Sequence, residues 1–325
     1  MTPEESAAIL PDRSPPGIVT GGDSEKKSAF VAVVGRPSAG KSTLVNKICG
    51  EKVAIVSAVP QTTRNAIRGI LNRPDGQLVF VDTPGRHLSG KKFNKKLTEV
   101  SGRQAEDADL VLYVLDASRP PGPEEEAIAQ WLAPLAGKTA AAINKIDAPG
   151  ANPAQAAAFL EEHLPGLKPE RRFPLSALRN EGIAPLLSCL YDMAEPGAPL
   201  YPEEYYTDQE AGFRIAEIIR EQAINRLRQE LPHSLYIDVA DMEFTEARED
   251  SPRPRLWVRA FIVVERESQK GMVVGRDGAM IKAIRQAAQK NINRIFDWKV
   301  ELDLRVKTGK DWRSNDQILR KIIDR

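Results

Sequence analysis

Short apolar segments alternate with amphipathic stretches over the first 195 residues. The apolar runs at 29–34, 78–81, 110–115 and 139–143, with another near Phe173, have the length and composition of buried strands. Helical periodicity is found at 41–49, 95–105, 124–135, 153–163 and 182–194. This alternation predicts an α/β domain with a doubly wound, mainly parallel sheet, in which ligands bind at the carboxyl ends of the strands.

A different pattern follows residue 195. Residues 196–206 contain Pro-Gly-Ala-Pro and Tyr-Pro, which are typical of a linker. Thr207 and Asp208 can then cap an amphipathic helix that continues to about residue 228. Strand-like segments at 234–244, 256–265 and 298–306 surround two helices joined by a Gly-x-x-Gly turn. The order αββααβ predicts a second, α+β domain over residues 207–325, after a first domain over residues 29–195.

Two polar motifs follow predicted strands of the first domain and point to phosphate. The segment 35–42 fits G-x-x-x-x-G-K-S between a strand and a helix, where backbone amides and a helix N-terminus can bind phosphate. Lys41 is expected to neutralise the β- and γ-phosphate oxygens, and Gly85 to offer its amide to the γ-phosphate. Ser42 and Asp82 are expected to hold Mg²⁺. The predicted phosphate-side residues are Gly35, Ser38, Ala39, Gly40, Lys41, Ser42, Thr43, Asp82 and Gly85.

Two further motifs point to guanine. Asn144, Lys145 and Asp147 follow one predicted strand, and the segment Ser176, Ala177 and Leu178 follows the next. The Asp147 carboxylate can accept from the ring N–H and the amino group of guanine, whereas adenine would leave a buried carboxylate unpaired. Each motif alone also fits a plain strand end or turn. Together, their order and spacing predict a site that binds and hydrolyses GTP without a covalent protein intermediate.

Charge is divided unevenly along the 325 residues, although the net charge is only +1. Residues 248–325 carry 19 Lys/Arg against 11 Asp/Glu, a net +8, and residues 1–247 carry 27 against 34, a net −7. Cys49 and Cys189 have no paired spacing, so neither a disulfide framework nor a zinc site is indicated, and a reducing cytoplasm is expected. No apolar run approaches the roughly 20 residues of a membrane span. Residues 1–28 have the features of neither a secretory signal nor a transit peptide, and we interpret them as a disordered tail.

The Gly-x-x-Gly turn of the second domain lies within its basic part. Two glycines let the backbone approach the sugar-phosphate of single-stranded nucleic acid, as in a KH domain. The structural alternative is a helix-turn-helix with a glycine C-cap and a solvated charged face. Element order and charge favour RNA binding, although Asp277 subtracts charge from the turn. The residues predicted to bind RNA are Lys270, Gly271, Met272, Val273, Gly275, Arg276, Asp277, Gly278, Ile281 and Lys282.

From about residue 28 to its end, the chain resembles the Era GTPases, in which a Ras-like P-loop G domain precedes a type II KH domain. The resemblance rests on the order of residues 35–43, Pro60-Gln61-Thr62-Thr63-Arg64, 82–85, 144–147, Tyr201-Pro202 with Thr207-Asp208, and 270–282. It implies a GTPase that acts in maturation of the small ribosomal subunit. It also implies that the KH groove binds the 3′ end of small-subunit ribosomal RNA, with GTP favouring the RNA-competent arrangement. We expect a cytoplasmic protein that is monomeric off the ribosome; some members of the family also associate peripherally with the inner membrane.

The resemblance also places the switches. Thr63, with Thr62 as the alternative, is expected to close onto Mg²⁺ and the γ-phosphate; a β-branched pair that enters an edge strand is the structural alternative. Lys41, Thr63 and Gly85 are thus the predicted catalytic residues. Arg86 stands where Ras-like enzymes have a water-orienting Gln, so we assign no side-chain base and expect slow turnover, on the order of 10⁻⁴ to 10⁻² s⁻¹. Ser38 replaces an Asn that related GTPases associate with a monovalent cation, which makes potassium activation doubtful.

Two other functions fit the same motifs. In the first, the protein is a non-catalytic interaction protein whose first domain only docks partners or membrane and whose second domain binds protein. In the second, it is a GTPase that regulates another RNA, such as a messenger, or a membrane or cell-cycle partner through a protein-binding second domain. GTP turnover with and without ribosomal subunits tests the first alternative, and sequencing of crosslinked RNA tests the second.

Overall fold

The computed structural model describes residues 26–57, 63–85, 102–228, 230–247 and 252–310, together with residues 312, 315 and 318. The main division of the chain falls between Asp208 and Gln209 and gives two compact units, each with its own hydrophobic core. Most of the tail expected at residues 1–28 lies outside the described residues. Among the described residues, the first strand begins at Lys27, two residues earlier than predicted, so the end of the expected tail is part of the sheet.

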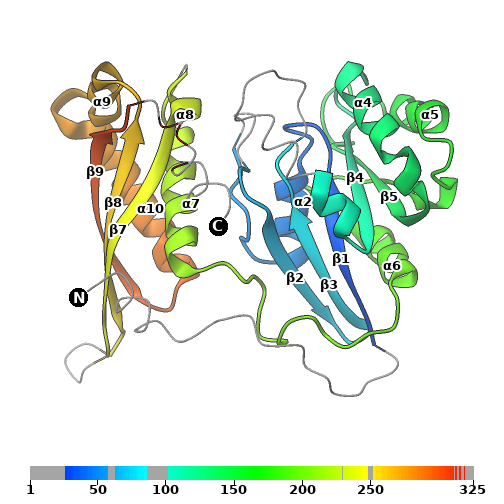
Figure 1. The fold of residues 1–325 in the computed structure, drawn as a ribbon, viewed down its shortest axis with the longest axis horizontal. Helices are drawn as coiled ribbons and strands as arrows, with labels where there is room; N and C mark the ends of the chain where they lie inside the picture. Colours follow the sequence, from blue (N-terminus) through cyan, green and yellow to red (C-terminus); the bar gives the residue numbers. More distant parts are fainter. Residues whose placement is uncertain are drawn as a thin grey trace. The chain divides into compact units, whose positions relative to one another are not determined.

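The first unit is built on a six-stranded sheet (Figure 1). Its strands lie in the order β2-β3-β1-β4-β5-β6, and all neighbours pair in parallel except β2 and β3, which are antiparallel. The predicted mainly parallel sheet is therefore present. The strands are β1 (Lys27–Val34), β2 (Ile67–Arg73), β3 (Gly76–Asp82), β4 (Leu110–Asp116), β5 (Thr139–Asn144) and β6 (Arg172–Pro174).

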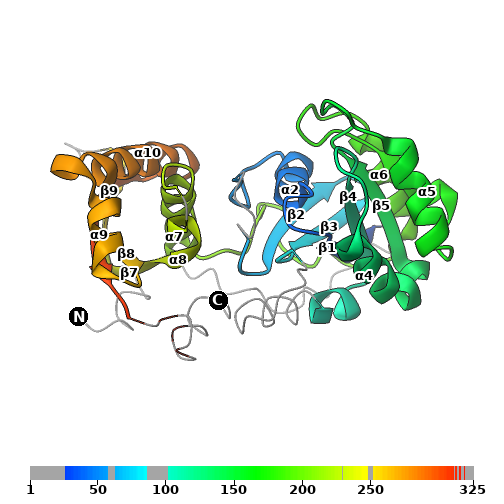
Figure 2. The same cartoon turned by 90° about the horizontal axis from the view of Figure 1, so that it is seen from above.

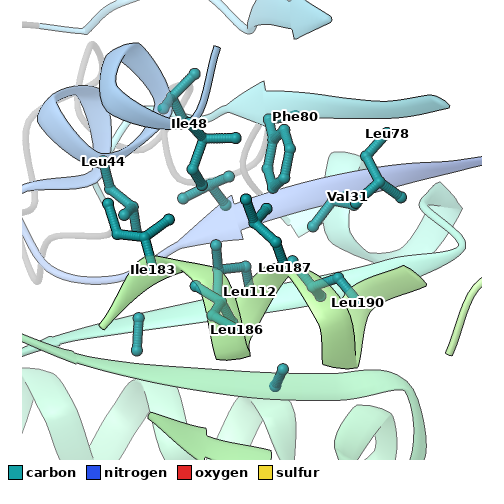
Figure 3. Close-up of a cluster of buried hydrophobic side chains, with 14 of the residues drawn as sticks. Val31, Leu44, Ile48, Leu78, Phe80, Leu112, Ile183, Leu186, Leu187 and Leu190 are labelled. Atoms are coloured by element: carbon teal, nitrogen blue, oxygen red, sulfur yellow. The ribbon is translucent and has the colours of Figure 1, made fainter. Parts of the chain in front are cut away.

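Helices cover both faces of this sheet. Successive strand residues point to opposite sides, so apolar strands present hydrophobic side chains on both faces for helices to cover. Val31 and Val33 of β1 pack in the same cluster as α2 (Lys41–Cys49) and α6 (Ile183–Met193). Figure 3 shows side chains of both helices around the sheet residues Phe80 and Leu112. Ala32 and Val34 instead join a cluster with α4 (Pro123–Leu132) and α5 (Pro153–His163). Two short 3₁₀ segments, Ala133–Lys138 and Pro169–Arg171, precede β5 and β6.

Two elements of the first unit cannot be matched fully to the apolar pattern of the sequence. The pattern does not predict β2, because its buried residues, among them Ile67 and Ile70, are interrupted by polar ones such as Arg68. The helix expected at 95–105 lies partly outside the described residues, and residues 102–107 are helical. None of the helices in the described part of the chain combines the length and the apolar content needed to cross a bilayer.

Residues 195–208, which we call the strap, follow α6, the last helix of the first unit, and lie along β2 and β3. Gln77 of β3 is 1% exposed and is fully hydrogen-bonded. Its Oε1 accepts from the backbone N–H groups of Leu200 (2.7 Å) and Tyr201 (2.8 Å). Its Nε2 donates to Tyr201 O (2.8 Å) and to Asn72 Oδ1 (2.6 Å). The segment predicted as a linker is thus attached to the first unit by specific hydrogen bonds.

Two residues at the end of the strap, Thr207 and Asp208, do not cap the next helix as predicted. Thr207 Oγ1 donates to Arg68 O (2.8 Å), and Asp208 Oδ2 accepts from Arg68 Nη1 (2.8 Å) and from the Tyr201 hydroxyl (3.0 Å). The following helix begins at Ala211, and its N-cap makes no side-chain hydrogen bond. The prediction that Thr207 and Asp208 cap this helix was therefore wrong, because both side chains are committed to β2 and the strap.

The second unit has the predicted αββααβ order (Figure 1). Its sheet has the order β7-β8-β9, with β7 and β8 antiparallel and β8 and β9 parallel. Helices α7 and α10 lie side by side on this sheet (Figure 2), and their apolar residues share one core with α9 and the strands. The elements are α7 (Ala211–Ile224), α8 (Leu231–Ser234), β7 (Leu235–Thr245), β8 (Arg255–Val264), α9 (Glu267–Val274), α10 (Ala279–Ile295) and β9 (Lys299–Thr308), with a 3₁₀ turn at Arg276–Gly278 between α9 and α10.

Candidate functional site

The loop between β1 and α2 has two positions that only glycine can occupy. Gly35 has φ +150°, and a Cβ atom there would lie 2.4 Å from the carbonyl oxygen of Val114. Gly40 has φ +96°, and a Cβ atom there would lie 2.3 Å from Asn144 Nδ2. Both glycines of the phosphate motif are therefore required by close packing as well as by backbone conformation. The loop is pressed against the ends of the neighbouring strands.

Lys41 folds back over this loop. Its Nζ donates to the carbonyl oxygens of Gly35 (3.0 Å) and Arg36 (3.1 Å), and its side chain is buried. Burial lowers the pKa of Lys41, while the charges of Asp82 and Glu125 raise it. A phosphate that replaced the two carbonyls would set a full negative charge against the ammonium, so that both donor and acceptor of the hydrogen bonds would be charged.

The three side chains predicted to hold Mg²⁺ meet at one point, although they come from three separate segments. Ser42 Oγ donates to Asp82 Oδ2 (2.6 Å), Thr63 Oγ1 donates to the same oxygen (3.2 Å), and the two hydroxyls are 3.0 Å apart. The other oxygen, Asp82 Oδ1, is buried and has no hydrogen-bond partner. Burial raises the pKa of Asp82, while Lys41 and the two hydroxyls lower it. Hard oxygen donors with one unpartnered carboxylate oxygen fit Mg²⁺, which prefers such ligands.

Gly85 lies directly against the phosphate loop. A Cβ atom there would come within 2.8 Å of Pro37 N and 2.9 Å of Pro37 Cα. Two residues earlier, Thr83 Oγ1 donates to Val33 O (2.8 Å), which ties the end of β3 to β1. Thr43, also predicted at the nucleotide, is half-buried in the first turn of α2. Arg86 and the second switch beyond it lie outside the described residues.

Asn144 joins the phosphate loop to the predicted guanine loop. Its Nδ2 donates to Ala39 O (2.9 Å), and its Oδ1 accepts from Ala177 N (3.0 Å). Lys145 takes a positive φ of 66°, and its Nζ donates to Ser38 O (2.7 Å). Asn144 and Lys145 thus hold two successive carbonyls of the phosphate loop.

The residues predicted to contact guanine form a small hydrogen-bonded group of their own. Ser176 Oγ donates to Asp147 Oδ1 (2.6 Å) and accepts from Arg179 N (3.0 Å). The Arg179 guanidinium Nε lies 4.0 Å from the second oxygen, Asp147 Oδ2. Leu178 is exposed. The Asp147 carboxylate is thus oriented by Ser176, and both of its oxygens keep capacity to accept from a base.

Asp116 belongs to the same site, although the sequence analysis did not select it. It ends β4 and pairs in register with Asn144 on β5. Its Oδ2 accepts from Lys145 Nζ (2.7 Å). Burial raises the pKa of Asp116, but the hydrogen bonds from Lys145 and Ser118 outweigh it and the net pKa is lowered. The position of Asp116 in the sequence could have indicated this role, since Asp116 ends an apolar strand in the same way as Asp82.

The Gly-x-x-Gly turn of the second unit is open to solvent on one side. Gly275 (φ +73°) is packed on Met280, whose Cβ would lie 2.7 Å from an added Cβ, whereas Gly278 (φ +73°) has nothing within 4 Å. Arg276 and Asp277 between them are 97% and 92% exposed, with Arg276 Nε 3.7 Å from Asp277 Oδ2. Asp277 therefore offsets part of the positive charge of the turn.

The other predicted RNA-binding residues divide between surface and core. Met272 and Lys282 are exposed, whereas Val273 is fully buried and Ile281 packs partly on the core. Lys270 Nζ forms an ion pair with Glu267 (3.0 Å). The carbonyl of Gly271 accepts from Gly275 N (2.9 Å), which ends α9 at the turn. Val273 thus anchors α9 in the core, while Met272 and Lys282 are available to a ligand.

Comparison with protein families gives one match in each unit. Residues 30–145 match the family described as 50S ribosome-binding GTPase, and residues 230–313 match the KH domain family. Two curated relatives are named GTPase Era. The protein of Treponema denticola is 50% identical over 295 residues, covering 91% of this chain and 99% of its own. That of Treponema pallidum is 43% identical over 324 residues, covering 94% and 100%.

Two solved structures have the same architecture over almost the whole chain. One is a crystal structure of Era in complex with MgGDPNP and nucleotides 1506–1542 of 16S ribosomal RNA, with a TM-score of 0.84, 32% identity and coverage of 91% and 98%. The other is a point variant of Aquifex aeolicus Era bound to GDP and AlF₄⁻, with a TM-score of 0.83, 32% identity and coverage of 90% and 98%. These matches confirm the predicted fold class, a Ras-like G domain followed by a KH domain.

Proposed function

This chain belongs to the Era GTPase family, and on that basis we propose that it is a GTPase whose nucleotide state controls binding to the 3′ end of small-subunit ribosomal RNA during assembly of that subunit. The observation that carries the proposal is the meeting of Ser42, Thr63 and Asp82 beside the phosphate loop, in a chain that also carries a KH turn. The similar Era protein was crystallised with MgGDPNP and nucleotides 1506–1542 of 16S ribosomal RNA.

The phosphate side of the site binds and orients the triphosphate. Lys41 exchanges its two loop carbonyls for β- and γ-phosphate oxygens, and backbone amides of the loop and of the first turn of α2 would bind the phosphates at the helix N-terminus. Ser42, Thr63 and Asp82 would hold Mg²⁺. The bound ion neutralises charge on the phosphates. Gly85, packed on Pro37, offers its amide to the γ-phosphate.

Hydrolysis then needs water attack on the γ-phosphorus in line with the leaving oxygen, and these residues supply position and charge rather than a covalent group. Thr63 is the residue that links the γ-phosphate to the following strand β2. When the γ-phosphate leaves, the Thr63 hydroxyl loses one partner and the segment before β2 is released. This release is the proposed switch.

The guanine side selects the base. Ser176 orients the Asp147 carboxylate, which accepts from the two N–H donors that guanine presents. Asp147→Asn replaces one acceptor by a donor, so we expect GTP affinity to fall and xanthosine triphosphate affinity to rise. Competition titration with both nucleotides measures this exchange. A variant that lost both equally would contradict the base contact.

In the second unit, the open side of the Gly275–Gly278 turn is the proposed site of the RNA backbone. Met272, exposed at the end of α9, is placed to contact a base, and Lys282 on α10 adds positive charge. Because phosphate contacts release counterions, affinity should fall with salt by a slope of roughly 0.7 per contact for a single strand. We also propose a cytoplasmic location; peripheral membrane association rests on the family resemblance alone.

The decisive experiment is titration of a short RNA copy of the small-subunit 3′ end at one fixed salt concentration. The protein is loaded in parallel with a non-hydrolysable GTP analogue and with GDP. Tighter binding in the analogue state supports nucleotide control. Equal binding in both states would remove the coupling but keep the RNA site, and no binding in either state would refute this RNA as the target.

A matched pair of variants tests the KH turn in the same titration. Gly278→Asn and Gly278→Asp have nearly the same shape, and both residue types tolerate a positive φ. Only the second adds a negative charge on the open side of the turn. We expect Gly278→Asp to weaken RNA binding much more than Gly278→Asn, and equal effects would argue against a phosphate at this position.

A further inference from the structure

A buried charged pair lies on the side of the phosphate loop that faces α4, and the chemistry proposed above does not use it. Arg36 follows Gly35 in the loop, and its Nε lies 3.1 Å from Oε1 of Glu125 in the first turn of α4. The two side chains are only 12% and 2% exposed. Arginine and glutamate are almost never buried to this extent unless they are paired, and burial of even a pair is costly.

Each oxygen of Glu125 has a different kind of partner. Tyr113 on β4 is fully buried and donates its hydroxyl to Oε2 (2.5 Å). Arg36 faces Oε1 in an ion pair, and its buried Nε and Nη2 make no hydrogen bond to the described residues, so charge rather than a directed hydrogen bond joins the two side chains. Burial raises the pKa of Glu125, and the hydrogen bond from Tyr113 and the charges of Arg36 and Lys41 oppose that rise. The carboxylate is therefore held between a strand, a helix and the phosphate loop. Arg36 Nη2 also lies 3.9 Å from Asp116 Oδ2.

The backbone of Arg36 is part of the phosphate site itself. Its carbonyl accepts from Lys41 Nζ (3.1 Å), and the preceding Gly35 is packed on β4. Further along the loop, Ser38 and Ala39 are held through their carbonyls by Lys145 and Asn144. Arg36, in contrast, is held through its side chain, which forms an ion pair with Glu125. A displacement of Arg36 would move the backbone that receives the phosphates.

We propose that Glu125 is a positioning residue for GTP binding and hydrolysis, which fixes the phosphate loop through Arg36. The inference rests on the proposed GTPase function and deepens it. Its positioning effect on the nucleotide is exerted through the loop. Tyr113 assists by holding the second carboxylate oxygen in place.

Electrostatics alone would give the opposite effect. Burial lowers the pKa of Lys41, and Asp82 and Glu125 raise it, so the charge of Glu125 is felt inside the phosphate site. Removal of a negative charge close to a polyanion would strengthen nucleotide binding. Glu125→Gln also removes the negative charge that holds the Arg36 guanidinium and leaves a neutral amide oxygen in its place, so the loop loses its ionic anchor. Weaker binding therefore indicates positioning, and tighter binding indicates charge alone.

The test is titration of GDP and a non-hydrolysable GTP analogue, with Mg²⁺, against the full chain. Because loss of a residue that orients ligating groups typically costs roughly tenfold to a hundredfold in metal affinity or activity, we expect Glu125→Gln to raise both Kd values by about the same factor. Tyr113→Phe, which removes only the hydroxyl, should give a smaller rise. Glu217→Gln is the matched control. It breaks the buried pair of Arg220 Nε and Glu217 Oε1 (2.7 Å) in the second unit and should leave nucleotide affinity unchanged.

A triple variant separates position from stability. Loss of one partner of a buried pair is strongly destabilising, whereas replacement of the whole group by apolar residues is often neutral. Arg36→Met with Tyr113→Phe and Glu125→Leu should recover the thermal midpoint lost in Glu125→Gln, but not the nucleotide affinity. Recovery of both would show that the pair serves stability alone and would overturn the proposal.

The remaining outcomes are also decisive. Unchanged or tighter binding by Glu125→Gln overturns the proposal, and if that variant does not fold, unchanged binding by Tyr113→Phe does so. Wild-type GTP turnover measured alongside tests the proposed function separately. Its absence would refute the GTPase, whereas normal turnover with unaffected variants would refute only the role of Glu125.

Discussion

Asn144 connects the two halves of the nucleotide site, and its replacement gives the sharpest test of the geometry. The side chain is buried, donates to Ala39 O at 2.9 Å and accepts from Ala177 N at 3.0 Å. Asn144→Ala would leave one buried carbonyl and one buried N–H without partners. At about 1–3 kcal/mol for each unsatisfied group, the expected loss in free energy of unfolding is about 2–6 kcal/mol.

Asn144→Asp distinguishes hydrogen bonding from simple filling of space, because the two side chains have the same shape. The aspartate would keep an acceptor for Ala177 N but would set a second acceptor against Ala39 O. We therefore expect Asn144→Asp to be at least as destabilising as Asn144→Ala. If Asn144 only filled the space beside Gly40, the aspartate would be tolerated.

Urea denaturation of the nucleotide-free protein measures the loss in stability, and GDP titration measures the loss in affinity. Asn152→Asp is the control, since Asn152 caps α5 at the surface by accepting from Gln155 N (3.0 Å). Aspartate is an equally good cap, so this change should stay within about 0.5 kcal/mol of wild type. Wild-type stability and GDP affinity in Asn144→Asp would refute the reasoning.

Three further predictions concern the metal site, the strap and a thiol. Ser42→Ala should lower nucleotide affinity in Mg²⁺ by roughly tenfold to a hundredfold but leave affinity in EDTA unchanged, and an equal loss in both titrations would contradict a metal ligand. Gln77→Leu removes the partners of three backbone groups of the strap and should cost about 3 kcal/mol in a denaturant titration, whereas Glu203→Ala, in an exposed ion pair with Lys26, should cost about 0–1 kcal/mol. Similar small losses in both would show that these bonds do not hold the strap. Burial raises the pKa of Cys49 to about 12, so its contribution to stability is complete below the unfolded thiol pKa of about 8.5 and decreases as the pH rises above it. Mass spectrometry after iodoacetamide treatment at pH 8 should find Cys49 alkylated only in urea, and rapid alkylation of the folded protein would contradict its burial.

The family and the mainly parallel sheet of the first domain could be predicted because the relevant signals are local. Each nucleotide motif directly follows an apolar run, and parallel strands bring their carboxyl ends to one edge of the sheet. That rule alone predicts that Asp82 and Asn144 approach the phosphate loop. The matches to Era proteins confirm the predicted family and fold. The roles of individual residues, including Thr63 and the KH turn, stay predictions.

Other features depend on contacts between distant segments, which no local pattern contains. Thr207 and Asp208 have the sequence of a helix cap, but Arg68, 140 positions from Asp208, offers a charged partner. Strand β2 has too many polar residues to be predicted alone, and it forms because it pairs with β3. Val273 lies in a stretch that suggests a ligand groove, yet it is buried in the core of the second unit.

The family, the two-domain order and the nucleotide motifs can all be found in the amino-acid sequence, because backbone conformation and strand-end chemistry are encoded within a few residues. The pairing of buried charges depends instead on how the chain folds. One such group joins a loop, a strand and a helix through Arg36, Tyr113 and Glu125. No local sequence pattern marks any of the three residues. A buried charge is stable only with a partner, so the fold had to bring these side chains together, and that pairing is visible only in three dimensions.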